Sequence, residues 1–264
     1  MLPLDWKPIP QDAGGPLFPV LYQAAAGGGT LALAVHDRQR GAGVGLTAVP
    51  AAIAGSLTWR RLESSHGGPR YPDLFGAAAA GGTLVAAVQN PAGEEPGAGA
   101  ALAFVPAPAV GRLDFQRVTQ NRGAGFPELF CAALPQGALL AAVHDPRNGV
   151  GVGLAWVTAP TRTLGWSRVD QSPSGPRFPR AFRVPAPGGM LVLADLEREA
   201  GTGAGLALVS GAVARLDWEQ LDQVQSGPRF PRHFHAPAEG GRLFLSLFDK
   251  PEGVGVDLAY LAGG

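Results

Sequence analysis

The sequence has little cysteine, little charge and no long apolar segment. A single cysteine, Cys131, excludes an internal disulfide and a metal site built on several thiolates. Charged residues make up 16% of the 264, and 21 basic side chains balance 21 acidic ones, which argues against nucleic acid or a membrane surface as partner. No apolar run reaches the roughly 18 residues that span a bilayer. The first residues lack the features of a secretory signal, so we expect a cytoplasmic protein.

Glycine and proline are abundant instead, with 39 and 25 residues, beside 46% apolar residues. This composition is typical of many short elements joined by tight turns, and not of long helices. Disorder also enriches glycine and proline, but Val, Leu and Phe recur at fixed positions along the whole chain. The composition therefore favours an ordered, all-β protein.

One sequence pattern occurs five times along the chain. Each copy opens with Leu-x-aromatic, continues with an aromatic–Pro pair eleven or twelve residues later, and has a second aromatic four positions after the first. A small turn, usually Gly-Gly, then leads to an apolar run, a polar turn, a Gly-x-Gly stretch and a last apolar segment. The aromatic before proline steps by 53, 55, 52 and 52 residues through Phe18, Tyr71, Phe126, Phe178 and Phe230.

Each copy has room for four short strands, and four strands in roughly 40–50 residues are typical of a propeller blade. We call the strand at Leu-x-aromatic d, the one at aromatic–Pro a, the one after the glycine turn b, and the last one c. A single blade cannot bury both of its faces, so the copies must pack around an axis. We predict a five-bladed β-propeller that forms one domain over residues 1–264, with repeats at about 4–56, 57–112, 113–163, 164–215 and 216–264.

The two ends of the chain predict how the ring closes. The first copy supplies a d strand at 4–6 before any a strand, and the last copy ends after its c strand. We therefore expect the N-terminal strand to complete the last blade, which leaves no sheet edge unpaired. A helical array is the competing interpretation, but the recurrent prolines and glycines would break its helices.

The layout resembles that of tachylectin-2-type five-bladed propeller lectins, whose repeats also contain a tryptophan, a glycine-rich turn, an aromatic pair, a turn with glycine and a strand. The tryptophans that carry the resemblance are Trp6, Trp59, Trp166 and Trp218. The resemblance covers all five copies, but only in layout: the spacings are longer here, and no sugar-binding motif of the family matches residue by residue. It implies the fold, whereas function has to be argued from a site.

Polar residues recur where the a strands begin and the b strands end. The hairpin between a and b returns the chain to its starting level, so the d–a and b–c loops share one face of the disc, which we call the d–a/b–c face. Loops on a rigid scaffold commonly carry function. We predict repeated sites on this face at which Arg and Asp bind sugar hydroxyls, formed by Arg70, Arg177, Arg229, His36, Asp37, Gln89, Asn90, His144, Asp145, Asp195 and Asp249.

Structural roles compete with this prediction. An Asp or Asn at a strand end commonly caps its own turn, and the arginines can instead pair with carboxylates of neighbouring blades. No metal site is expected, because His36–Asp37 and His144–Asp145 point their two side chains to opposite faces of a strand. We also expect the tryptophans to pack in the core, the Gly-x-Gly stretches to mark close backbone contacts, and Cys131 to be an inert buried thiol.

One position differs strongly between the copies, two residues after the first aromatic. It holds Val20, Asp73, Glu128, Arg180 and Arg232, and we expect these side chains near the channel as ion pairs between blades. The alternative is an enzyme with a single site in or above the channel, in which Asp73 and Glu128 act as acid and base beside the two arginines and His233.

The leading prediction is a non-enzymatic, lectin-like module that binds a glycan or another small molecule at repeated sites. An enzyme with one central site and a scaffold that binds a protein partner on one face are the alternatives. No cofactor is expected, and neither nucleic acid nor a membrane is expected as partner.

Overall fold

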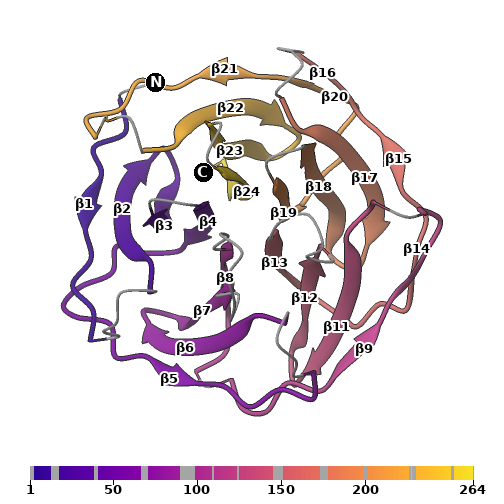
Figure 1. Ribbon diagram of the computed structural model, residues 1–264, viewed down its shortest axis with the longest axis horizontal. Helices are drawn as coiled ribbons and strands as arrows, with labels where there is room; N and C mark the ends of the chain where they lie inside the picture. The colour runs from indigo at the N-terminus through magenta and orange to yellow at the C-terminus, as the bar shows by residue number, and fades with distance from the viewer. Residues whose placement is uncertain are drawn as a thin grey trace.

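In the computed structural model, five antiparallel sheets of four strands stand around a common axis, as Figure 1 shows. The predicted all-β, five-bladed propeller is therefore confirmed. No helix among the described residues is long and apolar enough to cross a membrane, and the cytoplasmic location stays a prediction. The structure describes residues 3–12, 18–38, 41–66, 71–89, 99–108, 110–123, 125–144, 151–172, 178–198, 201–225, 227, 230–250 and 253–263.

Each blade takes its four strands, in chain order, from one copy of the repeat. The outermost d strands are β1 (Lys7–Pro8), β5 (Arg60–Arg61), β9 (Phe115–Arg117), β15 (Ser167–Arg168) and β21 (Glu219–Gln220). The a strands are β2 (Val20–Ala26), β6 (Asp73–Ala79), β11 (Glu128–Leu134), β17 (Arg180–Ala186) and β22 (Arg232–Ala238). The b strands are β3 (Gly29–Arg38), β7 (Gly82–Gln89), β12 (Gly137–Val143), β18 (Gly189–Arg198) and β23 (Gly241–Lys250).

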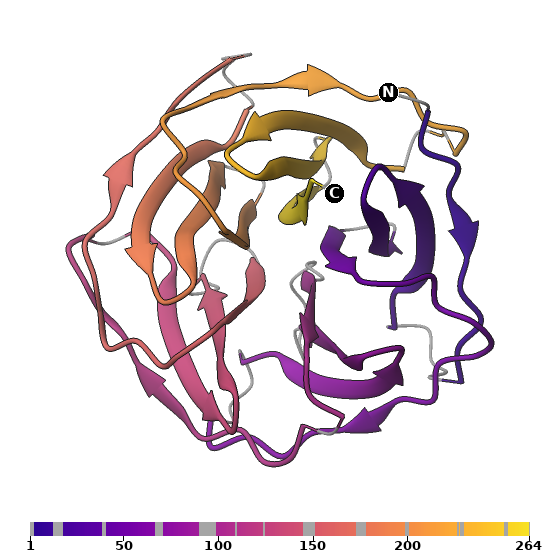
Figure 2. The ribbon, with the colours of Figure 1, turned by 180° about the vertical axis from the view of Figure 1, so that it is seen from behind.

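The c strands line the axis, and Figure 2 shows them there from the opposite side. They are β4 (Gly41–Val49), β8 (Gly99–Val105), β13 (Val152–Val157), β19 (Gly201–Val209) and β24 (Gly253–Ala262). Every residue of β7 and β12 is buried, because a neighbouring blade covers each face of these sheets. The turn into the b strand uses a glycine with positive φ, 82° at Gly81 and 103° at Gly28, which other residues rarely adopt.

The ring closes in a different way from the sequence prediction. Lys7 and Pro8 pair with β2 of their own blade, and blade 5 already has β21 as its outer strand, so the prediction that the N-terminal strand completes the last blade is wrong. Leu4 instead pairs in parallel with Gln223, donating its N–H to Asp222 O and accepting the N–H of Val224, both at 2.9 Å. The chain after Leu-x-aromatic turns toward its own a strand, so only the leucine segment reaches the neighbouring blade.

The same parallel link occurs at every junction between blades. Leu57 pairs with Gln11, and Leu113 pairs with Ser64. At the other two junctions the link is a two-stranded parallel sheet, formed by β10 (Thr119–Gln120) with β14 (Thr163–Leu164) and by β16 (Asp170–Ser172) with β20 (Arg215–Asp217). The closing junction is thus built like the four others, from backbone hydrogen bonds at the perimeter.

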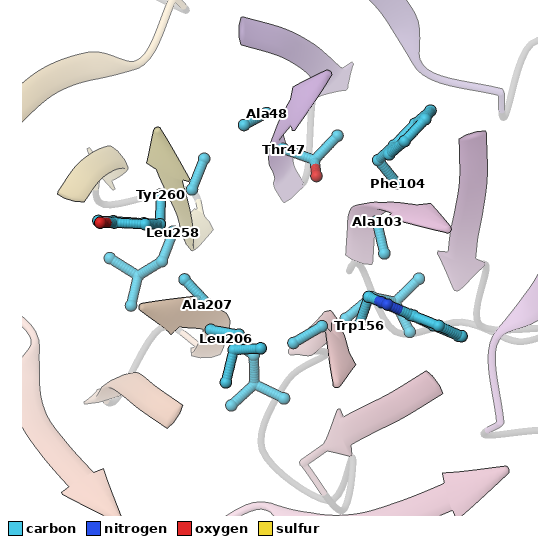
Figure 3. Close-up of a pocket in the computed structure, with 13 residues that line it drawn as sticks. Thr47, Ala48, Ala103, Phe104, Trp156, Leu206, Ala207, Leu258 and Tyr260 are labelled. Atoms are coloured by element: carbon cyan, nitrogen blue, oxygen red, sulfur yellow. The ribbon is translucent and has the colours of Figure 1, made fainter. Parts of the chain in front are cut away.

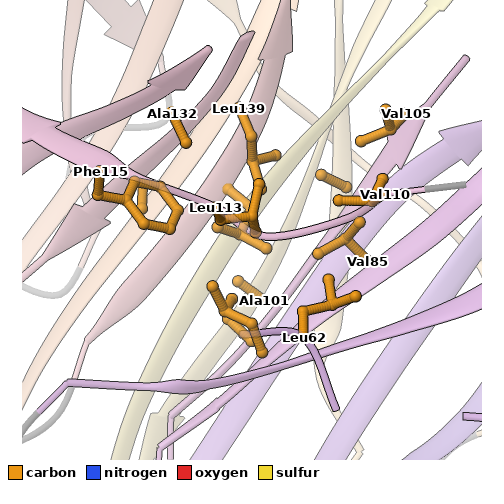
Figure 4. Packing of buried hydrophobic residues seen from close by; sticks show 14 of the residues in the cluster. Leu62, Val85, Ala101, Val105, Val110, Leu113, Phe115, Ala132 and Leu139 are labelled. Carbon is orange, nitrogen blue, oxygen red and sulfur yellow. The ribbon is translucent and has the colours of Figure 1, made fainter. Parts of the chain in front are cut away.

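The hydrophobic core is divided into five clusters, one between each pair of neighbouring blades. Figure 4 shows the cluster between blades 2 and 3, where Leu62 and Val85 lie near Leu113 and Leu139. The cluster between blades 5 and 1 contains Leu4 and Trp6 from the first repeat. Each blade is therefore stable only with a neighbour on both faces.

Truncating Leu4 tests the closure. Leu4 is 1% exposed and Val20 is 52% exposed. We expect Leu4→Ala to lower the free energy of unfolding by roughly 2–5 kcal/mol, and the matched Val20→Ala to change it by less than about 0.5 kcal/mol. Urea unfolding of both variants measures this, and equal effects would show that Leu4 does not close the ring.

Candidate functional site

The predicted residues on the d–a/b–c face are only partly described. Arg70, Asn90, Asp145, Arg177 and Arg229 lie outside the described residues, as do the side chains of Asp37 and Asp249. The remaining four, His36, Gln89, His144 and Asp195, are buried. Three of them lie on b strands and His144 directly follows one, and all four are enclosed by neighbouring blades and not exposed at the rim. The prediction of repeated sites on this face is not tested by these four and stays a prediction.

Two of these buried residues form a hydrogen bond between blades 3 and 4. Nε2 of His144 lies 3.1 Å from Asp195, and Arg180 donates to the other carboxylate oxygen at 2.5 Å. In the strand pair of blade 4, Asp195 lies opposite Arg180, and in that of blade 2 Val88 lies opposite Asp73. Asp195 is therefore the equivalent of Val88, and the other copies have an apolar residue at this position. The pair joins two blades and has no exposed carboxylate oxygen, since Asp195 is 0% exposed.

The residues expected near the channel lie far out on the blades. Val20, Asp73, Glu128, Arg180 and Arg232 each begin an a strand, two strands away from the axial one. The sequence prediction that they lie near the channel is therefore wrong. The order of the strands from the axis outward, which the repeat pattern does not reveal, decides their place.

The acids at this position pair within their own blades. Arg61 donates to Asp73 at 2.5 Å, and Arg117 donates to Glu128 at 2.6 Å, each across one exposed strand pair. The expected ion pairs between blades are thus wrong for these two acids, because the outer d strand supplies a closer partner. Asp73 and Glu128 lie in different blades and do not form one acid–base pair.

His233 is buried between blades 5 and 1. Its Nδ1 lies 2.7 Å from Ser246 Oγ, and its ring lies 4.9 Å from that of Trp6. Burial lowers the pKa of His233 to about 3, so the ring is neutral at physiological pH. His233 thus lies apart from Asp73 and Glu128, and the structure does not bring the proposed catalytic group together.

Sequence analysis missed a recurrent link between the tryptophans and the preceding blade. Trp59 donates its indole N–H to Gln11 Oε1 at 3.0 Å, and Gln11 donates to the carbonyl of Pro19 at 2.7 Å. We call this arrangement the Trp–Gln lock. It recurs with Trp166 and Gln120 and with Trp218 and Gln171. At the closing junction Gln223 bonds Pro231 O at 2.9 Å, while Trp6 Nε1 has no partner among the described residues.

The junction between blades 2 and 3 lacks this lock. Ser64 stands where the other copies have glutamine, and Phe115 stands where they have tryptophan. A cavity of about 670 Å³ lies at this junction, and Ser64 is one of the residues that line it. We call it the blade 2–3 cavity. Its polar lining comes from Arg61, Glu63, His66, Tyr71, Asp73 and Arg112.

Tyr71 is the unusual residue of this cavity. The other four copies have phenylalanine at this position. The hydroxyl of Tyr71 is buried and has no hydrogen-bond partner in the part of the chain that the structure describes, and burial raises its pKa above the usual range. An unpartnered buried hydroxyl costs stability, so its presence calls for an explanation beyond packing.

Both arginines of the cavity are paired with carboxylates, and Glu63 adds a further acidic group. Arg61 pairs with Asp73, and Arg112 donates to Asp114 at 2.9 Å. The ring of His66 packs 5.5 Å from that of Tyr71, and its Nε2 lies 2.7 Å from Phe115 O. Paired guanidinium and carboxylate groups beside aromatic rings can bond several neutral hydroxyl groups at once.

A second cavity, of about 130 Å³, lies on the axis near the ends of the c strands, on the face opposite the d–a/b–c face. Figure 3 shows Thr47, Ala103 and Ala207 around it. Beneath it the c strands approach so closely that a Cβ on Gly45 would lie 2.8 Å from the backbone of Ala101. The expectation that the Gly-x-Gly stretches mark close backbone contacts is confirmed.

Asp257 occupies the axis beneath this cavity, at the position held by Gly45, Gly153 and Gly205 in other copies. It is fully buried and accepts the N–H of Leu46 at 2.7 Å and of Leu258 at 2.8 Å. Burial raises its pKa well above the usual range, while backbone N–H groups of four c strands oppose that rise. Sequence analysis missed Asp257, although its departure from glycine is visible in the repeats.

Comparison with protein-family models and with curated proteins finds no match to this chain. The resemblance to tachylectin-2-type lectins therefore rests on the layout of the repeats alone.

Replacing His233 and Ser246 by the residues of the other blades tests whether His233 is neutral in the folded protein. Three other blades pair leucine with alanine where blade 5 pairs His233 with Ser246. Because the pKa is lowered in the folded state, the unfolded chain binds the proton first, and stability falls as the pH drops from about 6.5 toward 3. Relative to wild type, the double variant His233→Leu/Ser246→Ala should gain about 2 kcal/mol between pH 7 and pH 5.

Urea unfolding of wild type and double variant at both pH values measures this difference. Parallel pH profiles would mean that His233 already carries its proton in the folded protein.

Proposed function

We propose that this protein is a non-enzymatic binding module that recognises carbohydrate on its d–a/b–c face, with its principal site in the blade 2–3 cavity. The observation that carries the proposal is the polar cavity itself, with its paired arginines and carboxylates beside aromatic rings. The hydroxyl of Tyr71 is buried in the cavity wall with no partner among the described residues, so a ligand bonds it by displacing the atoms that cover it. Tyr71 ends the d–a loop of blade 2, so the cavity belongs to the face on which the sequence predicts binding.

The chemistry of the lining favours neutral hydroxyl groups. Each arginine already faces a carboxylate, Arg61 with Asp73 and Arg112 with Asp114. An anionic ligand would have to displace these carboxylates, whereas a hydroxyl both donates to a carboxylate and accepts from a guanidinium. A sugar ring also offers an apolar face to aromatic side chains such as His66 and Tyr71.

The cavity predicts one strong site, whereas the repeated polar loops predict several equivalent ones. Four junctions carry the Trp and Gln residues of the lock, and the blade 2–3 junction carries Ser64 and Phe115. An enzyme is the weaker candidate, because Asp73, Glu128 and His233 lie in three different blades. A protein-interaction scaffold stays a prediction.

A glycan array identifies the ligand, and isothermal titration with the best neutral oligosaccharide gives affinity and stoichiometry. We expect one site per chain and roughly tenfold weaker binding for Tyr71→Phe, the loss of one hydrogen bond. Phenylalanine is native at this position in four copies, so the variant should keep its fold. Binding that Tyr71→Phe leaves unchanged, or a stoichiometry near five, would exclude this cavity as the principal site.

A matched pair of charge variants separates the cavity from general surface effects. Asp73→Asn removes a carboxylate from the cavity, while Glu128→Gln removes the equivalent carboxylate of blade 3, which does not line it. We expect only Asp73→Asn to weaken binding in the same titration. Equal losses of affinity in the two variants would indicate that the negative charges of this face in general, and not the cavity, hold the ligand.

Building the missing lock provides the strongest test. Ser64→Gln/Phe115→Trp restores the residues of the other junctions and places a larger side chain at position 64, on the wall of the cavity. We expect the double variant to lose binding below detection while its melting temperature stays equal to or above that of wild type. A variant that folds and still binds would place the ligand elsewhere.

A further inference from the structure

The floor of the axial cavity is made of backbone. Leu154, Leu206 and Leu258 line this cavity, yet their side chains are buried in the clusters between the blades. The atoms that these residues present to the cavity are therefore those of the main chain. Leu46 and Leu102 hold the equivalent positions in the other two c strands.

The hydrogen bonds of Asp257 fix the direction of these backbone groups. The N–H of Leu46 points to Asp257 on the axis and not to the adjacent strand β3. In an antiparallel ladder the N–H and C=O of one residue point to the same edge of the strand, so the carbonyl of Leu46 also points to the axis. The carbonyl of Leu46 lies on the C-terminal side of its amide along β4. The cavity lies on the same side, beside Thr47 and Ala48, which come next in the strand. The carbonyl oxygens thus lie between Asp257 and the cavity.

The ring of carbonyls must be narrow. One carboxylate accepts the N–H groups of Leu46 and Leu258, and the N–H groups of Leu102 and Leu206 also lie near enough to oppose the rise of its pKa. These four residues belong to four different strands. These strands therefore come within a hydrogen-bond length of a single group on the axis. Carbonyls of the same leucines converge on the axis just above it. No Lys, Arg or His is among the residues that line the cavity, so the described lining offers no side-chain cation to balance these oxygens.

We propose that this carbonyl ring binds one hard cation, Na⁺, K⁺ or Ca²⁺, on the axis above Asp257. Such cations take oxygen ligands, and backbone carbonyls in a ring replace their hydration shell. Asp257 lies at short range below the ring, and a bound cation favours its ionised form, which burial alone disfavours. Thr47, seen at the cavity in Figure 3, adds a hydroxyl oxygen near its wall. Water and further ligands enter from the cavity.

The cation has a structural role that the five separate clusters do not provide. It joins one oxygen from each blade, so it stabilises the closed ring at the axis, where the perimeter links do not reach. Binding to the folded state alone raises the melting temperature. This site is independent of the carbohydrate site, since it lies on the axis and opens on the opposite face.

Thermal unfolding tests the proposal. The full chain is dialysed against a chelator into tetramethylammonium chloride, a cation too large for the ring, and then measured with NaCl, KCl, CaCl₂ or MgCl₂ at constant ionic strength. We expect Na⁺, K⁺ or Ca²⁺ to raise the melting temperature by roughly 5 °C at saturation. Asp257→Asn should lose this response, and Asp195→Asn, a buried carboxylate away from the axis, should keep it.

A crystal of the wild-type protein grown in RbCl or CaCl₂ gives a second readout that needs no variant. We expect an anomalous difference peak on the axis between Asp257 and the cavity. The proposal is overturned if no cation raises the melting temperature above that in tetramethylammonium chloride and the crystal shows no anomalous difference peak on the axis. It is equally overturned if Asp257→Asn folds and keeps the full response.

Discussion

The close approach of five strands at one axis is the constraint on which the rest of the molecule depends. A Cβ on Gly205 would lie 2.5 Å from Cα of Asp257, and one on Gly45 would lie 2.8 Å from Ala101. Only very small residues fit there, apart from Asp257, whose carboxylate points into the space that they leave. The blades pack as wedges from this point outward, and each wedge needs a neighbour on both faces.

Much of the fold is predictable from the sequence because each blade is encoded locally. The aromatic–Pro pair, the glycine turn (Gly-Gly in four copies, Gln136-Gly137 in the third) and the Gly-x-Gly stretch mark three strands in every copy. The pattern does not say which neighbouring blade a segment contacts. Leu4 lies beside Gln223 of the last blade, while Lys7 turns back to its own. Both belong to one short segment, so periodicity alone cannot separate them.

The candidate site was less predictable, for two physical reasons. Asp73 and Glu128 were expected near the channel, but distance from the axis depends on strand order, which the spacing does not contain. The cavity depends on a paired change, Ser64 for glutamine with Phe115 for tryptophan, in positions that lie far apart in the sequence. Both changes are visible when the copies are aligned, yet their link emerges only from the hydrogen bond between Trp59 and Gln11 in an intact junction.

Function in this molecule is proposed to reside where one repeat departs from the others. The Trp–Gln lock is the hydrogen-bonded arrangement of an ordinary junction. The junction between blades 2 and 3 lacks it and has instead a polar cavity and the unpartnered hydroxyl of Tyr71. A crystal structure of the protein with its best neutral oligosaccharide tests this directly. The account predicts sugar density in the blade 2–3 cavity within hydrogen-bond distance of Tyr71 Oη, and density confined to the rim loops or to the axis would contradict it.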